Sequence, residues 1–383
     1  MFNKAQAYHH LTSLAYPRGI GSFGEKRSHS YINQSLEQLG ITVDNQVFTF
    51  SKITDYLLRI LPFLGGVCLW LFTVVFPAQS LNAFYLLSGS IMLVLSSSFF
   101  SIPFGKLHKF NTTLKSANII GHIPSLSEPT HQIVFVAHYD SKSQTLPIAI
   151  RALCFFILVL SLFLIMCSHV LSFYFYRYPF TMVNLISGYV SLLSGLLLFF
   201  NITRNSSPGA ADNASGVSIV LELARVFSKM PLLHTQVTVL FTSAEEYGMA
   251  GAFYYMENNP DLKLQVSFIN IDGVGDSAPV GIVRAKKTFI SSIGKKLYDE
   301  IIKTAHSLSL PCVPLKTLIG IGFDHIPIAL CGFSVVTLCS YSPKMVLRIH
   351  SKRDTRDHVC VHSMDTIGRL CEKYTRDCDS QKQ

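Results

Sequence analysis

The stretch VTVLFTSAEEYGMAG, Val237 to Gly251, joins an apolar run to two adjacent glutamates, Glu245 and Glu246. The run VTVLF alternates β-branched and apolar residues, which is typical of a buried strand. Two neighbouring carboxylates repel each other unless a positive charge lies between them. Taken alone, such a pair is typical of a solvated loop. The ends of the other predicted strands decide between a loop and a cation site.

Several other apolar runs are also followed by residue types that bind metal ions. These residues are His138 and Asp140 after Ile133–Ala137, Asp272 after Val266–Ile271, Asp212 before a predicted helix, and His350 in the polar segment VLRIHSKRDT. Each has an ordinary explanation by itself, because an Asp before a helix is usually an N-cap and a His in a polar segment is usually exposed. Together they match a two-metal hydrolase in number and type.

The alternation of predicted strands and helices indicates an α/β fold. We expect a mostly parallel central sheet with helices on both faces. The strands are predicted at Val43–Phe50, Ala117–Ile123, Ile133–Ala137, Val237–Thr242, Val266–Ile271 and Ser334–Cys339, and the helices at Ala5–Leu14, Glu25–Leu39, Ser215–Met230 and Phe289–His306. Ligands of such sheets bind at the carboxyl ends of the strands, where the candidate residues lie.

The chemistry of hydrolysis explains why these residue types occur together. Zinc binds imidazole nitrogen and carboxylate oxygen, and one carboxylate can bridge two ions that lie about 3.5–4 Å apart. The attacking water needs a base that is not tied to metal, and Glu245, beside the ligand Glu246, fits that role. Asp140 follows His138 by two residues and can accept the second ring N–H of that histidine.

Four apolar blocks interrupt this pattern and predict membrane helices. They are Tyr56–Pro77, Leu81–Pro103, Ala152–Phe173 and Phe180–Phe200. Each approaches the roughly 20 residues that a helix needs to cross a bilayer. Their close pairing predicts two transmembrane hairpins, at residues 55–105 and 149–203, which divide the α/β domain into residues 1–54, 106–148 and 204–383.

Composition and charge agree with a membrane protein. Hydrophobic residues make up 49% of the chain and charged residues only 14%, and no cleavable signal is expected because MFNKAQAYHHL is polar. Basic residues flank the side of the hairpins that joins the polar parts, whereas Arg177 alone lies in the opposite turns, so we expect the polar parts in the cytoplasm. The net charge of +9 fits a surface near anionic lipids, and its scattered distribution argues against nucleic acid. The 9 Cys show no CxxC spacing, as expected in a reducing compartment.

The motifs also resemble the di-zinc aminopeptidases and carboxypeptidases, a family that includes bacterial leucyl aminopeptidase and, as divergent relatives, the glutaminyl cyclases. The matching pieces occur in family order and are HYDS, GAADNASG, SAEEYGMAG, NIDGVG, FDHIPIALCGFSVV and HSKRDT. The N-terminal stretch that begins AQAYHHLTSLAYPRGIG is similar to the opening helices of the family. The resemblance covers nearly all of the chain except the predicted hairpins.

This resemblance implies a role for each candidate residue. His138 and Asp272 would bind one zinc, Glu246 and His350 the other, and Asp212 would bridge them. Glu245 would be the general base that activates the metal-bridging water, and Asp140 the partner of His138. The family also implies a cis peptide bond at Asp212–Asn213.

One departure from the family pattern concerns the oxyanion. Some relatives place a tyrosine shortly before the Asp-His pair, but the corresponding stretch here is LIGIGFDH. Stabilisation of the oxyanion would then fall to a metal or to another group. Asp324 and His325 are expected to shape the pocket, and His325 is the candidate donor to the oxyanion.

The leading hypothesis is a membrane-anchored di-zinc exopeptidase, with an aminopeptidase favoured over a carboxypeptidase. Its partners would be a peptide substrate and the lipid bilayer. An alternative enzyme is a single-zinc acyl transferase similar to glutaminyl cyclase. A third hypothesis is a metal-free binding or scaffold domain on the same fold, which the complete set of expected ligands argues against.

Overall fold

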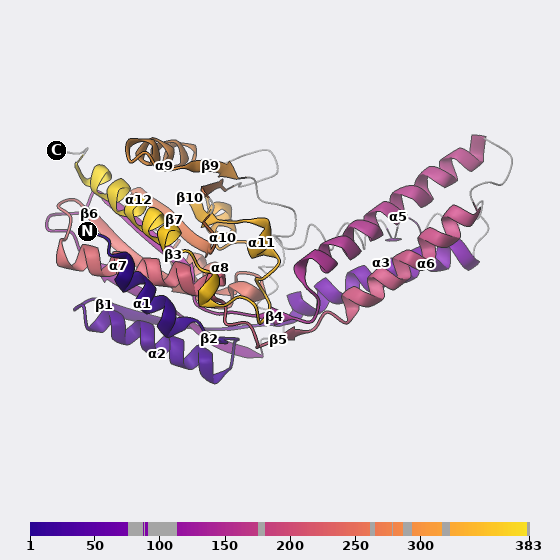
Figure 1. Ribbon diagram of the computed structural model, residues 1–383, viewed down its shortest axis with the longest axis horizontal. Coiled ribbons are helices and arrows are strands. Elements are labelled where there is room, and N and C mark those ends of the chain that lie inside the picture. Colours follow the sequence, from indigo (N-terminus) through magenta and orange to yellow (C-terminus); the bar gives the residue numbers. More distant parts are fainter. Residues whose placement is uncertain are drawn as a thin grey trace. The chain divides into compact units, whose positions relative to one another are not determined.

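The computed structural model describes residues 1–75, 87, 89–90, 113–174, 181–260, 265–277, 279–285, 293–315 and 322–380. The chain forms two compact units (Figure 1). One, here the sheet unit, comprises Met1–Ser51, Gly105–Ser143 and Asn205–Gln383. The other, here the helical unit, comprises Lys52–Phe104 and Gln144–Arg204. The helical unit thus contains two insertions into the sequence of the sheet unit.

The sheet unit is built on an eight-stranded sheet in the order β1-β2-β6-β3-β7-β10-β8-β9. Its strands are β1 (Thr42–Phe50), β2 (Leu114–Ile123), β3 (His131–His138), β6 (Thr235–Thr242), β7 (Gln265–Val274), β8 (Val280–Arg284), β9 (Cys312–Leu315) and β10 (Ser334–Ser340). The four central strands β6, β3, β7 and β10 are parallel to one another. The strand β1 pairs antiparallel with β2, β2 with β6, and β8 with β10, whereas β8 and β9 are parallel. The predicted mixed α/β fold with a mainly parallel centre is therefore confirmed.

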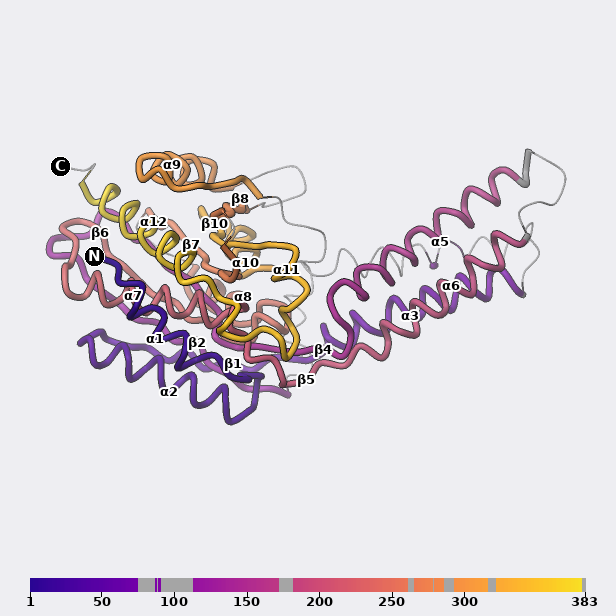
Figure 2. The backbone as a smooth tube through the Cα atoms, viewed as in Figure 1, coloured from indigo at the N-terminus to yellow at the C-terminus, as the bar shows by residue number. Residues whose placement is uncertain are grey.

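Helices cover both faces of this sheet. On one face, α1 (Lys4–Leu14), α2 (Phe23–Glu37), α7 (Ser215–Lys229), α9 (Lys295–Ser307) and α12 (Val361–Ser380) form a connected layer, and α1 runs beside both α7 and α12 (Figure 2). On the other face lie α8 (Ala250–Asn258) and α10 (His325–Leu330), which contact each other. The short α11 (Pro343–Val346) follows β10.

Burial explains the central position of α7. Its positions Val217, Val220, Leu221 and Ala224 are all buried, which is the helical spacing of apolar residues seen in the sequence. Phe227 stacks on Phe135 of the fully buried strand β3, with ring centroids 6.2 Å apart. At the other end of the helix, a Cβ on Gly216 would lie only 2.4 Å from the carbonyl oxygen of Ile271, so the start of α7 lies directly against β7. Asp212, just before this start, is thereby placed near the end of that strand.

The structure of this unit differs from the sequence prediction at the two helices described next, and it also contains elements that were not predicted, namely β8, β9, α8, α10 and α11. The helix predicted at Phe289–His306 begins at Lys295, directly after Gly294, whose φ of 73° breaks the helical path; its predicted first residues lie outside the described ones. The C-terminal helix α12 was not predicted, because its sequence is polar and buries only one stripe of residues.

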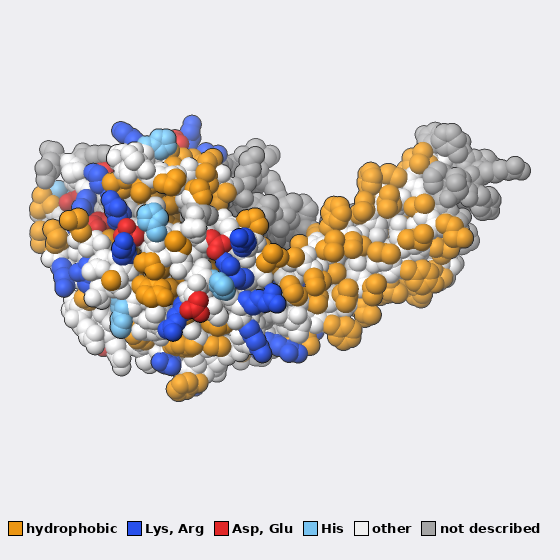
Figure 3. All heavy atoms as spheres, in the orientation of Figure 1, with side chains coloured by type: hydrophobic (Ala, Val, Ile, Leu, Met, Phe, Trp, Pro, Cys, Tyr) orange, Lys and Arg blue, Asp and Glu red, His pale blue; other side chains and the backbone are white. Residues whose placement is uncertain are grey.

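The helical unit contains three described helices, α3 (Ile53–Val75), α5 (Ile148–Tyr174) and α6 (Thr181–Phe199). Within the described residues, three segments are long and apolar enough to cross a membrane, namely Ile53–Val74, Ile148–Leu171 and Met182–Phe199. On the face drawn in Figure 3, hydrophobic side chains cover these helices almost continuously, and Phe156 and Ile186 are each more than 60% exposed. Such a surface is unusual for helices in water.

The prediction of two separate hairpins is not confirmed in that form. The apolar block Leu81–Pro103 lies outside the described residues, apart from residues 87, 89 and 90. The helix α3, from the first predicted hairpin, packs against α6 from the second. A Cβ atom on Gly66 would lie only 2.6 Å from the carbonyl oxygen of Ser191, so the close approach of these two helices requires glycine.

Candidate metal centre

The register of the central strands brings the predicted site residues to one edge of the sheet. His138, the last residue of β3, pairs with Thr242, the last residue of β6. Glu245 and Glu246 follow β6 within a short 3-10 turn, Glu245–Tyr247. Asp272 lies near the end of β7, on the other side of β3. Parallel strands therefore place the imidazole between the carboxylates of two neighbouring strand ends.

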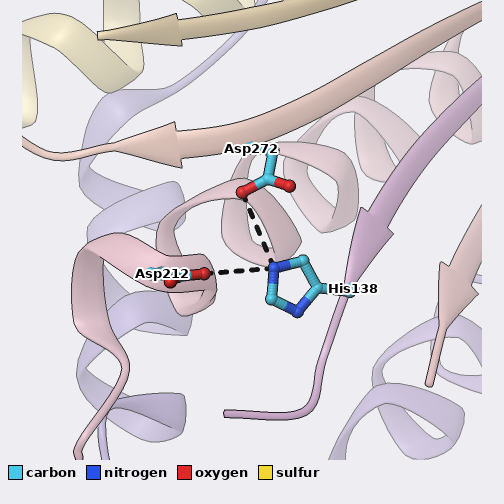
Figure 4. Close-up of side chains that lie close together, drawn as sticks. All are labelled: His138, Asp212 and Asp272. Carbon is cyan, nitrogen blue, oxygen red and sulfur yellow. Dashed lines mark ion pairs between the residues drawn. The ribbon is translucent and has the colours of Figure 1, made fainter. Parts of the chain in front are cut away.

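The first cluster joins His138, Asp212 and Asp272, whose side chains point toward one another (Figure 4). The Nε2 atom of His138 lies 3.2 Å from Oδ1 of Asp212 and 3.6 Å from Oδ1 of Asp272. All three side chains are buried. Within the described part of the chain, His138 Nε2 has no partner in hydrogen-bonding geometry, which fits a lone pair directed at a cation.

The second cluster joins Asp212, Glu246 and His350. The Nε2 atom of His350 lies 3.1 Å from Oδ2 of Asp212 and 3.1 Å from Oε2 of Glu246. Asp212 thus directs one oxygen toward each histidine. His350, in the loop after α11, has a φ of 57°, and its side chain is 18% exposed. The two clusters offer imidazole nitrogen and carboxylate oxygen, which is the donor set that zinc prefers.

Asp140 ties the two glutamates to the histidine loop. Its carboxylate accepts the backbone N–H groups of Glu245 and Glu246, at 3.2 and 3.3 Å. The Nδ1 atom of His138 lies 3.2 Å from the backbone carbonyl oxygen of Asp140 and 3.5 Å from its carboxylate. The residue predicted to orient the imidazole is therefore in place, with its carbonyl oxygen closer than its carboxylate.

Asp354 holds the loop that carries Asp212. Its carboxylate accepts the backbone N–H groups of Ala211 and Asp212, at 2.8 and 3.2 Å. The peptide bond Asp212–Asn213 is cis, which confirms the expectation from the family resemblance. Asp354 belongs to the quoted motif HSKRDT but was not predicted as a site residue. The sequence does not indicate that its carboxylate accepts hydrogen bonds from the backbone N–H groups of Ala211 and Asp212.

Arg18, near the N-terminus, joins the two ligand loops and was missed by the sequence analysis. Its side chain is 1% exposed. Its guanidinium donates to the carbonyl oxygens of Tyr139 at 2.9 Å, Pro208 at 2.7 Å, Gly209 at 2.9 Å and Tyr16 at 2.9 Å, and also to that of Leu14. The loop after β3 and the loop before Asp212 are thereby fixed to the same cation. Contacts to backbone carbonyls leave no residue pattern in a sequence.

Electrostatics separate the roles of the carboxylates. Burial raises the pKa of Asp212, but the two neighbouring imidazoles of His138 and His350 outweigh it, so the pKa of Asp212 is lowered. Burial also opposes ionisation of Glu246, yet the charges of His350 and Lys142 lower its pKa to about 2. For Glu245, burial and the charges of Glu246, Asp272 and Asp324 raise the pKa well above its usual value. Asp212 and Glu246 therefore remain anionic, whereas burial raises the pKa of Asp272. Glu245 is a stronger proton acceptor than Asp212 or Glu246.

Asp324 and His325 are both buried at the start of α10. Asp324 accepts a hydrogen bond from the hydroxyl of Thr242, and burial raises its pKa to about 7. The Nδ1 atom of His325 lies 2.7 Å from the hydroxyl oxygen of Thr337, and burial lowers the pKa of His325 to about 4, so the ring is neutral. Neither residue is part of the two ligand clusters.

Tyr341 is a further aromatic residue near the ligands. Its ring lies against Gly273, where a Cβ would be 2.6 Å from the phenol oxygen, and its centroid is 6.0 Å from that of Phe323. Burial and the charges of Asp272, Asp212 and Glu245 raise the pKa of Tyr341, so its hydroxyl stays protonated. In some relatives the tyrosine that contacts the oxyanion precedes the Asp-His pair, so Tyr341, which follows β10, was not predicted from the sequence.

Comparison with known proteins identifies the family. The sequence profile described as Peptidase family M28 matches residues 118–375, which include every predicted ligand. The chain belongs to peptidase family M28. This confirms the resemblance to zinc peptidases, and the family implies zinc as the metal.

The curated relatives in this family match only part of the chain. The M28 protein described here is 24% identical over 172 residues to Aminopeptidase YwaD of Bacillus subtilis (strain 168), which covers 43% of this chain and 36% of that protein. It is 37% identical over 71 residues to Endoplasmic reticulum metallopeptidase 1 of Homo sapiens, which covers 18% of this chain and 8% of that protein. The chain therefore spans much less than two thirds of the length of these relatives.

Solved structures extend the similarity to the whole fold. Glutaminyl cyclase of Porphyromonas gingivalis has a TM-score of 0.58 at 16% identity, with 98% of this chain and 99% of that chain covered. A leucine aminopeptidase precursor from Bacteroides thetaiotaomicron VPI-5482 has a TM-score of 0.58 at 15% identity, with 98% and 97% covered. At these identities the likeness shows the fold alone, which peptidases and cyclases share.

Replacing Arg18 tests its place in the centre. We expect Arg18→Met to lower the free energy of unfolding by at least about 3 kcal/mol, because several buried carbonyl groups lose their donor. Denaturant titration of the detergent-solubilised protein measures this change. The control is Arg27→Met, an exposed arginine over the ring of Tyr16 at 4.6 Å, which should cost less than about 1 kcal/mol. If the two substitutions lowered the free energy of unfolding equally, Arg18 would not be the residue that holds the two ligand loops together.

Proposed function

We propose that this protein is a membrane-anchored zinc exopeptidase, most simply an aminopeptidase that uses two zinc ions. The observation that carries the proposal is the pair of ligand clusters that share Asp212, with Glu245 next to the ligand Glu246. Membership in peptidase family M28 supports hydrolysis of a peptide bond. The similarity to Aminopeptidase YwaD supports cleavage at the N-terminal end of the substrate. His138 and Asp272 would hold one ion, Glu246 and His350 the other, and Asp212 both.

The residues of the chain divide the chemistry among them. Zinc, when bound, acts as a Lewis acid that polarises the substrate carbonyl and makes water more acidic. Glu245 takes a proton from the attacking water as the new C–O bond forms, and returns it to the nitrogen as the C–N bond breaks. The raised pKa of Glu245 suits both transfers. The carboxylate of Asp140 accepts a hydrogen bond from the backbone N–H of Glu245 and so holds that residue in position.

Two donors are available for the oxyanion that develops on the carbonyl oxygen. We propose His325, which is neutral because burial lowers its pKa, and the protonated hydroxyl of Tyr341. Neutral donors are effective when they are already oriented before the reaction. The contact of His325 with Thr337 and that of Tyr341 with Gly273 hold both side chains in fixed positions.

The membrane part of the proposal is supported by composition. We propose that the chain crosses the bilayer four times, as two inserted hairpins at residues 55–105 and 149–203, and that the peptidase domain faces the cytoplasm. Three apolar helices among the described residues and the similarity to Endoplasmic reticulum metallopeptidase 1 support membrane attachment. The distribution of basic residues supports the orientation.

A single-zinc acyl transferase similar to glutaminyl cyclase is the second candidate. The observation in its favour is the fold, because the glutaminyl cyclase structure covers 98% of this chain. The two candidates differ in products, since a cyclase releases ammonia from an N-terminal glutamine and leaves every peptide bond intact. They also differ in the number of metal ions that the reaction needs.

Substitution of the proposed base gives the first test. We expect Glu245→Gln to reduce kcat by about 10²–10⁴-fold, because the amide cannot accept the proton of water. Steady-state hydrolysis of an aminoacyl-7-amido-4-methylcoumarin measures the rate, and elemental analysis should show an unchanged zinc content. Glu37→Gln, at an exposed position on α2, should leave the rate unchanged. Undiminished turnover in Glu245→Gln would remove Glu245 from the mechanism.

Blocking the substrate distinguishes the kinds of peptidase. The protein should release the first residue of a free peptide and fail on the same peptide after N-acetylation, since an aminopeptidase recognises the free amine. Mass spectrometry of the products identifies the bond that is cut. Cleavage of the acetylated peptide from its C-terminal end would mean a carboxypeptidase. Release of ammonia from a glutaminyl peptide, with no shortening, would mean a cyclase.

Protease protection tests the orientation. In sealed vesicles with the cytoplasmic face outward, an epitope tag placed after Gln383 should be digested by added protease without detergent. A lumenal domain marker in the same vesicles serves as the control and should survive. A tag that is digested only after detergent is added would place the peptidase domain on the opposite side.

A further inference from the structure

Lys142 makes three contacts with the ligand Glu246. Its Nζ atom lies 3.1 Å from Oε2 of Glu246, and it also donates to the backbone carbonyl of Glu246 at 2.8 Å. Its backbone N–H donates to Oε1 of the same side chain at 3.2 Å. Both carboxylate oxygens of Glu246 are therefore engaged by one residue. Lys142 was not among the residues that the sequence predicts for the centre.

The ammonium group is held in a fixed position, unlike that of an ordinary surface lysine. Its side chain is 16% exposed, and the side chain of Glu246 is 4% exposed. The carbonyl of Glu246 anchors the charge, while Asp140 ties together the two loops from which Lys142 and Glu246 come. An exposed ion pair is weak because ordering its two side chains costs entropy and because water screens the charges. Here Lys142 is already ordered by its contacts and largely shielded from water, so both effects are small.

The same oxygen of Glu246 faces both the ammonium and a histidine ligand. Oε2 lies 3.1 Å from Nζ of Lys142 and 3.1 Å from Nε2 of His350. In contrast, no lysine or arginine forms an ion pair with Asp212 or Asp272 in the part of the chain that the structure describes. One of the two ligand clusters thus already contains a positive charge, and the other does not.

We propose that Lys142 makes the two metal subsites unequal, so that the subsite of Glu246 and His350 binds its ion more weakly than the subsite of His138 and Asp272. The inference rests on the proposed two-metal function. One dication and the ammonium together balance the three ligand carboxylates, whereas a second dication leaves excess positive charge in a buried site. A fixed positive charge within a few Å of a bound cation raises the free energy of that bound state.

Lys142 would determine the order in which the two subsites fill. At low zinc, one ion occupies the subsite of His138 and Asp272, and Lys142 supplies the positive charge beside Glu246. The second ion enters only when the zinc concentration rises, because it must share Glu246 with the ammonium. Lys142 is therefore a positioning residue that sets the order and the affinity of metal binding.

Zinc titration of the full chain in detergent micelles tests the inference. Competition with a chromophoric chelator gives the two dissociation constants, and elemental analysis gives the stoichiometry. We expect two unequal constants in the unsubstituted protein. Lys142→Met, which keeps the apolar stem and removes the charge, should tighten the weaker constant by about tenfold or more and leave the stronger one within about threefold. Lys142→Arg should preserve the inequality, and the exposed Lys26→Met should change neither constant.

A ligand substitution assigns the effect to one subsite. In an Asp272→Asn background the remaining strong binding belongs to Glu246 and His350, and adding Lys142→Met should tighten it by about tenfold. In a His350→Ala background, adding Lys142→Met should change the remaining constant by less than about threefold. The opposite pattern, or equal constants in the unsubstituted protein, would overturn the inference.

The failure of the inference can be distinguished from failure of the proposed function. If two zinc ions bind and Asp272→Asn and His350→Ala each remove one, but Lys142→Met changes neither constant, then the proposed role of Lys142 is wrong and the two-metal centre stands. If Asp272→Asn and His350→Ala leave zinc binding unaltered, the two-metal centre itself is wrong.

Discussion

The carboxylate of Asp212 lies between two imidazoles, with one oxygen 3.2 Å from His138 and the other 3.1 Å from His350. Around it lie the carboxylates of Asp272 and Glu246, all in a buried environment. So many buried anions at such separations are tolerable only with compensating positive charge. The rest of the sheet unit can be understood as the framework that holds these anions together: parallel strands supply His138 and Asp272, and α7 sets the position of Asp212.

Much of this arrangement follows from sequence because it depends on local patterns. An apolar run followed by a histidine or a carboxylate predicts a strand end, and parallel strands bring such ends together. His138, Glu246 and Asp272 could be placed at one edge for that reason. His350 could not be placed by pattern, since it lies in a loop after α11, and only the family resemblance linked it to the others.

The residues that the sequence did not reveal act through the backbone or through distant partners. Arg18 donates to main-chain carbonyls more than 100 residues away, and carbonyl groups carry no sequence information. Lys142 contacts Glu246 because β3 and β6 are neighbours in register, which periodicity alone does not establish. The packing of α3 against α6 was also missed, because the apolar blocks were paired by their proximity in sequence.

The buried guanidinium of Arg18 and the carboxylate of Asp354 hold the same loop, the one that carries Asp212, although they lie far apart in the sequence. During synthesis, that loop cannot reach its final geometry until the segment of Asp354, which follows both inserted apolar segments, has left the ribosome. A nascent or truncated product that ends before His350 has neither His350 nor Asp354, and so cannot assemble both ligand clusters. The two ligand clusters therefore form only after both inserted apolar segments and the segment of His350 have been synthesised.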